Sequence, residues 1–177
     1  MVTCGHTDPV TGKECHWTTF RICTTTYMLA NGLAATLYKK FGGKWYFITP
    51  DYAYGHTLQA AYATILKRMG GTVLGNSLSP LGTTDFSSYL IKAQSTNPQV
   101  LVLLVDGQDL VNCMKQAAQF GLQKKMPIGG GLSELEGLNA LSPEARLGWW
   151  TLEWYWNQPN TPHVKEWVDR YRKLYPD

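Results

Sequence analysis

Short, entirely apolar runs alternate along this chain with longer segments in which apolar residues recur every three or four positions. The run Val100–Val105 contains only valine and leucine. Such a run, with no polar alternation, is typical of a strand buried on both faces of a parallel sheet. The longer segments have the period of amphipathic helices. The alternation therefore favours an α/β fold, with an open and mostly parallel sheet between helices.

About five strands are predicted, which is the size of a flavodoxin-like or Rossmann-like lobe. The predicted strands are Trp45–Thr49, Thr72–Asn76, Val100–Val105, Met126–Ile128 and Leu147–Trp154. The helical stripes cover residues 29–41, 58–69, 86–93, 110–120, 132–141 and 163–175, with threonines 24–26 and residues 83–85 as N-caps. The glycines 129–131 are expected to end the fourth strand in a turn. Residues 1–19 carry no regular pattern, and Phe20–Cys23 is a short extended piece.

The composition is that of a globular domain. Apolar residues make up 44% of the 177 positions and charged residues 16%, which is too apolar for a disordered chain. The net charge of +3 is scattered without a long basic run, so we expect no nucleic-acid partner. No stretch approaches the roughly 20 apolar residues of a membrane helix.

The amino terminus lacks the basic and then apolar pattern of a signal peptide. We expect the sequence to begin inside a longer, exported protein. Cys4 and Cys15 flank a loop of turn-forming residues that a disulfide can close in an oxidising compartment. With His6 and His16 they also form a zinc alternative, but the ligand spacing is atypical, and a disulfide or free thiols are preferred. Cys23 and Cys113 are read as small buried apolar residues.

Ligands of open parallel sheets bind outside the carboxyl ends of the strands. The first strand leads into Tyr52 and Tyr54, the third into Asp106 and Gly107, and the last into Trp154–Trp156. Each position has a structural alternative: a core aromatic for Tyr54, a helix cap for Asp106, and packing for the tryptophans. The set contains no Ser–His–Asp arrangement and no phosphate-loop lysine, which favours binding over catalysis. We therefore predict no catalytic residue, no metal and no cofactor.

Several segments, in order, resemble type I periplasmic binding proteins, in particular the branched-chain amino-acid-type binding components of ABC importers. They are Lys44–His56 with its D-x-x-Y-G pattern, Leu81–Leu90, Asn97–Val105 and Lys115–Leu122. Residues 10–15 and Phe20-Arg21 are similar to the crossover that enters the second lobe. The resemblance covers nearly the whole chain.

The resemblance implies a second-lobe fragment of a periplasmic or otherwise extracytoplasmic protein. Residues 1–25 would be the crossover, 26–156 the ligand-binding lobe, and 157–177 a linker and terminal helix toward the missing first lobe. The implied partners are a small solute, that first lobe and the membrane permease of an ABC importer. The ligand-binding residues implied are Tyr54, Asp106, Tyr52, Gly107 and Gly130. A position that is often acidic falls on glycines 129–131, so an amide or an aromatic acid joins amino acids as a candidate solute.

Two other functions stay open from the sequence. A ligand-sensing receptor or regulatory domain uses the same fold, which alone does not separate the two. A small flavodoxin-like enzyme would need a phosphate-binding loop after the first strand, and Pro50–Gly55 is too aromatic for one.

Overall fold

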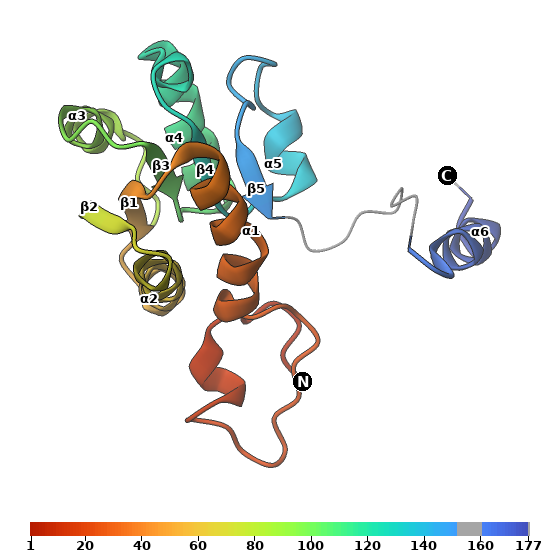
Figure 1. Cartoon of the computed structure of the whole chain (residues 1–177). Coiled ribbons are helices and arrows are strands. Elements are labelled where there is room, and N and C mark those ends of the chain that lie inside the picture. The colour runs from red at the N-terminus through yellow and green to blue at the C-terminus, as the bar shows by residue number, and fades with distance from the viewer. Residues whose placement is uncertain (152–160, 177) are drawn as a thin grey trace.

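The computed structural model describes residues 1–151 and 161–176. Its centre is a five-stranded sheet in the order β2-β1-β3-β4-β5 (Figure 1). All neighbouring strands run parallel, which confirms the predicted α/β fold. The strands are β1 (Lys44–Pro50), β2 (Thr72–Ser79), β3 (Val100–Leu103), β4 (Ile128–Leu132) and β5 (Trp149–Thr151).

Helices connect the strands and cover both faces of the sheet. Thr25 accepts a 3.2 Å hydrogen bond from the Met28 backbone N–H at the start of the first helix, as its predicted N-cap role requires. The helices are α1 (Thr26–Phe41), α2 (Ala53–Arg68), α3 (Ser87–Ser95), α4 (Gly107–Gln119), α5 (Leu135–Asn139) and α6 (Val164–Leu174), with short 3-10 turns η1 (Asp8–Thr11) and η2 (Leu122–Lys124).

Successive side chains of β1 point to opposite faces and separate two cores. Trp45 and Phe47 pack with the apolar stripes of α1 and α2. Tyr46 and Ile48 pack with α3 and α4 on the other face. All these side chains are buried, because a parallel sheet with helices on both sides leaves neither face to water.

The prediction that the glycines 129–131 end the fourth strand in a turn is wrong. These glycines lie within β4. A Cβ atom on Gly130 would stand 2.0 Å from the Leu103 carbonyl oxygen, and one on Gly131 would stand 2.7 Å from a Leu58 methyl group. The neighbouring backbone and side chains approach too closely for any side chain there. Close packing therefore overrides the low strand propensity of glycine.

Two other predicted boundaries move. The third helix begins at Ser87 rather than at Phe86, and the Asp85 carboxylate accepts a 2.9 Å hydrogen bond from the Ser87 backbone N–H. The predicted helix over 132–141 shortens to α5, because β4 continues through Leu132. The predicted strand Leu147–Trp154 corresponds to β5, which begins at Trp149. The last three predicted positions and the cluster Trp154–Trp156 lie outside the described residues.

The amino-terminal segment is tied to the start of α1 by long-range polar contacts. The Asp8 carboxylate accepts hydrogen bonds from the Thr26 hydroxyl at 2.8 Å and the Tyr27 backbone N–H at 3.3 Å. Arg21 donates to the carbonyl oxygens of His6 and Thr7 at 3.1 and 2.6 Å. Figure 1 shows this segment beyond α1, on the side toward which β5 points.

The four cysteines are free thiols in the structure. Of the two alternatives for Cys4 and Cys15, a disulfide or free thiols, the structure has free thiols, and both residues are exposed. Cys113 lies in the core as predicted, where burial raises the pKa of its thiol. Cys23 is only half-buried.

The close approach at Gly130 predicts a strong effect of a single methyl group. Gly130→Ala should lower the free energy of unfolding by about 3 kcal/mol or more, because the clash is with backbone that cannot move aside cheaply. Gly137→Ala is the control: the nearest atom would be a Val111 methyl at 3.7 Å, and alanine in α5 should be neutral or stabilise by up to about 1 kcal/mol. Urea denaturation of both variants measures this, and equal stabilities would contradict the packing argument.

A candidate ligand cleft at the carboxyl ends of the strands

A pocket of about 340 Å³ lies where β1, β3 and β4 end. Four separate segments form its wall. Three of them follow β1, β3 and β4 and converge because the carboxyl ends of parallel strands meet at one edge of the sheet, and the fourth is the amino-terminal segment. The lining residues are Cys4, Gly5, His6 and Thr7 from the amino-terminal segment, Tyr52 and Tyr54 after β1, Asp106 and Gly107 after β3, and Leu132 and Glu134 at the end of β4.

Four of the five predicted ligand-binding residues line this pocket together: Tyr52, Tyr54, Asp106 and Gly107. Gly130 lies elsewhere, buried within β4, where its carbonyl oxygen accepts a 2.9 Å hydrogen bond from the Tyr62 hydroxyl. Its role is in packing the strand, and it is not among the lining residues.

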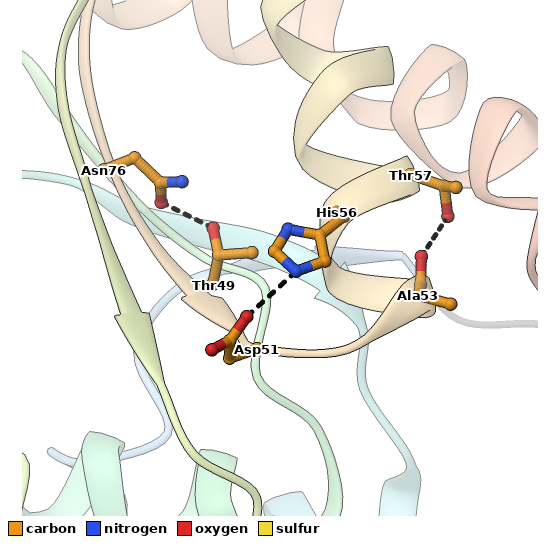
Figure 2. A network of polar contacts seen from close by, with 6 residues as sticks. All are labelled: Thr49, Asp51, Ala53, His56, Thr57 and Asn76. Atoms are coloured by element: carbon orange, nitrogen blue, oxygen red, sulfur yellow. Dashed lines mark hydrogen bonds and ion pairs between the residues drawn. The ribbon is translucent and has the colours of Figure 1, made fainter.

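The turn between β1 and α2 is braced from both sides (Figure 2). The Thr49 hydroxyl donates to the Asn76 side-chain oxygen at 2.7 Å and so joins β1 to β2. The His56 Nε2 atom lies 2.9 Å from an Asp51 carboxylate oxygen and closes the turn onto the first turn of α2. This bracing holds the two tyrosines that follow β1, whose rings lie 5.8 Å apart, in place against the pocket.

Asp106 stands at the N-cap position of α4, yet its side chain makes no capping hydrogen bond. The carboxylate instead accepts a long 3.4 Å hydrogen bond from the Tyr52 hydroxyl. The structure therefore does not support the alternative that Asp106 serves as a helix cap.

Burial raises the pKa of Asp106, and the nearby carboxylates of Asp109 and Glu134 raise it further, while the Tyr52 hydrogen bond opposes them. Burial, together with the charge of Asp106, raises the pKa of Tyr52 to about 12. Tyr52 therefore stays a neutral donor at physiological pH. The hydrogen bonds from Tyr52 and from the Asp106 backbone compensate the carboxylate only in part, because burial and the neighbouring carboxylates still raise its pKa. Asp106 is therefore able to accept from a cationic or N–H group in the pocket.

Gly107 adopts a left-handed backbone with φ of 51°, and no atom stands within 4 Å of where its Cβ would lie. The glycine serves the sharp turn from β3 into α4, where other residues are strained. Gly107 lines the pocket next to Asp106.

His6 and Glu134 line the pocket but were not predicted as ligand-binding residues. His6 is buried; its Nδ1 lies 2.8 Å from the Thr24 carbonyl oxygen, and its ring centroid lies 6.1 Å from that of Tyr54. Nothing in the sequence indicates the path of the loop that brings it there. Glu134 could have been predicted from the sequence. If the fourth strand had been extended through its glycines, the end of the strand would have fallen beside this residue.

The zinc alternative at the amino terminus finds little support in the geometry. The Cys4 sulfur lies 3.9 Å from His6 Nε2. Within residues 1–151 and 161–176, no group of three or more His, Cys, Asp and Glu side chains is arranged to hold a metal ion. In the same ranges, no helix combines the length and the apolarity that crossing a membrane requires.

The model of the periplasmic binding protein family matches residues 2–177. The chain belongs to this family. No curated protein sequence matches it at a significant level.

Solved structures of periplasmic binding proteins are similar to this chain. An amino acid ABC transporter substrate-binding protein from Pseudomonas fluorescens is 31% identical, with a TM-score of 0.86, over 95% of this chain and 46% of the other. A periplasmic binding protein from Burkholderia mallei is 36% identical, with a TM-score of 0.82, over 94% and 44%. A branched-chain amino acid ABC transporter ligand-binding protein from Burkholderia xenovorans is 28% identical, with a TM-score of 0.81, over 96% and 46%. The chain thus spans just under half the length of these relatives.

The raised pKa of Asp106 predicts how stability depends on pH. Between its unfolded and folded pKa values the folded state binds more protons, so stability falls as the pH rises through this range. Asp106→Asn removes the partly compensated charge and should raise the melting temperature at pH 7. The difference from the parent chain should shrink as the pH falls to about 4, where the unfolded carboxylate also protonates.

Asp85→Asn is the matched control with the opposite sign. The hydrogen bond from the Ser87 N–H lowers the pKa of Asp85, so its contribution to stability is present above the unfolded pKa and is lost as the pH falls through the folded pKa. This variant should melt at the same or a lower temperature than the parent at pH 7. A lower melting temperature for Asp106→Asn at pH 7 would mean that Asp106 stabilises the fold.

Proposed function

We propose that this chain is a solute-binding lobe of an ABC importer's extracytoplasmic binding protein and that its pocket is one wall of the ligand cleft. One observation carries the proposal: Asp106 stands at a helix start without capping it and faces a pocket whose other walls are aromatic and polar. A side chain kept in this partly desolvated state is typical of a binding site. The family and its solved members support the same conclusion.

The ligand group that fits this wall is a nitrogen donor, either an ammonium or an amide N–H. Asp106 offers a carboxylate, and Glu134 adds a second one at the edge of the same pocket. The half-buried ring of Tyr52 offers a face for an apolar side chain or for the cation itself. Tyr54 lines the pocket but is only 5% exposed and belongs to the core, as its structural alternative predicts. No lysine or arginine of the described residues lines this pocket. We therefore propose an amino acid or a small amide as the solute, with an acidic group of the ligand contacted from elsewhere.

A second lobe would supply that opposite wall. The similar structures are about twice as long as this chain, and closure of two lobes over a ligand is a common hinge motion. In this proposal the closed protein delivers its solute to the membrane permease of an importer outside the cytoplasm. The lobe binds and releases the solute without turnover.

The nitrogen requirement is tested with two compounds that differ only in the amino group. Titrating the 177-residue chain with L-leucine should shift the backbone NMR signals of residues 52–54 and 106–107, with a dissociation constant weaker than about 1 mM because one wall supplies only part of the contacts. The amine-free analogue 4-methylpentanoate should not shift them. Equal shifts from both compounds would contradict a nitrogen-donor ligand, and micromolar affinity would contradict the need for a second lobe.

Removing the charge tests Asp106 in a protein that includes both lobes. Asp106→Asn should weaken binding of the solute by about 10- to 100-fold, the usual loss for a charge-assisted hydrogen bond, without lowering the melting temperature. Asp85→Asn, exposed and outside the pocket, should leave calorimetric affinity unchanged. Unchanged affinity in Asp106→Asn would remove this carboxylate from the site.

A further inference from the structure

A second pocket, of about 300 Å³, lies at the opposite edge of the sheet. It is formed where α1 ends and where β4 and β5 begin, whereas the cleft is formed where strands end. Ile128, the first residue of β4, lines this pocket, and Leu132, the last, lines the cleft. These two residues are about 13 Å apart along the strand. Because the sheet lies between the two pockets, one small ligand cannot occupy both.

The polar groups at this pocket are donors and cations. Lys124 and Lys125 line it and are exposed, and Gln123 lies beside them. The side-chain nitrogen of Gln123 is buried and has no hydrogen-bond partner within the described parts of the chain. A buried amide N–H without a partner costs free energy, and a ligand oxygen would satisfy it once the Gln123 side chain turns toward the pocket.

The rest of the lining is apolar and partly aromatic. Phe41 and Trp149 meet edge to face with ring centroids 5.6 Å apart. The Lys40 ammonium lies 4.1 Å from the Trp149 ring centroid and brings a third cation to the rim. The remaining described lining residues are Met126, Pro127, Ile128, Leu147 and Gly148, so no acidic side chain of the described residues lines this pocket.

We propose that this pocket binds a small organic anion that combines a flat apolar body with a carboxylate. The apolar body lies against Trp149 and its neighbours, and the carboxylate accepts from the Gln123 amide and from the Lys124 and Lys125 ammonium groups. Ionised acceptors form the stronger hydrogen bonds with such donors. The preference is opposite to that of the cleft, whose wall carries carboxylates, and this proposal does not depend on the one made for the cleft.

The probe is phenylacetate, and 2-phenylethanol is its uncharged analogue of similar shape. Titration of the chain with phenylacetate should shift the backbone NMR signals of residues 123–128 and 147–149, and 2-phenylethanol should bind at least about tenfold more weakly. The paired change Lys124→Gln with Lys125→Gln should weaken phenylacetate binding by about tenfold. Raising the salt concentration should also weaken it, because the lysines are exposed.

Two further variants keep the outcome decisive. Lys67→Gln with Lys92→Gln removes the same charge from exposed positions outside both pockets and should leave binding unchanged. Gln123→Met keeps the side chain's size, removes the buried donor, and should weaken binding several-fold with no loss of melting temperature. The proposal is overturned if phenylacetate shifts the cleft signals instead, shifts none, binds no better than 2-phenylethanol, or binds the Lys124/Lys125 variant as well as the parent chain.

Discussion

The burial of the sheet on both faces is the constraint on which the rest of this structure depends. All four residues of β3 are fully buried, and the strand is hydrogen-bonded on both sides, to β1 and β4. A polar side chain inside such a strand would lose its hydration without a partner. Polar chemistry is thereby confined to the two edges where strands start and end. Both pockets lie at these edges, and each has its own electrostatic character because different loops form it.

The partly compensated carboxylate of Asp106 in the cleft has a cost in folding free energy. An aspartate at the N-cap position normally stabilises a helix by capping it, but the Asp106 side chain makes no capping hydrogen bond and its carboxylate faces Tyr52 at 3.4 Å instead. Sites that must bind a ligand commonly retain groups that are incompletely satisfied in the free protein. In the proposed function a ligand nitrogen would supply the missing partner, and part of the binding free energy would then come from relieving this cost.

Much of the fold and part of the site could be predicted from the sequence, and the successes share a cause. Val100–Leu103 was recognisable because an uninterrupted apolar run has few alternatives, and Tyr54 and Asp106 were found by locating the strand ends. The glycines of β4 were misplaced in the prediction. They are required because Leu103 and Leu58 approach the strand too closely for a side chain, and no local sequence pattern indicates such an approach. That error also concealed Glu134. His6 reaches the cleft through contacts with residues 15 or more positions away, beyond what spacing can indicate.

The amino-terminal segment has a consequence for folding. It brings Cys4–Thr7 into a wall shared with Glu134, and contacts between positions so far apart in the chain form late, because the loop between them must first be closed. The sheet does not need this segment: in the described chain its only strand-like contact is the isolated bridge between Val2 and Arg21. Detachment of the segment would therefore abolish the pocket while leaving the sheet intact, as a local opening below the free energy of global unfolding. A ligand in the cleft would slow hydrogen exchange in the first 25 residues before it protected β3.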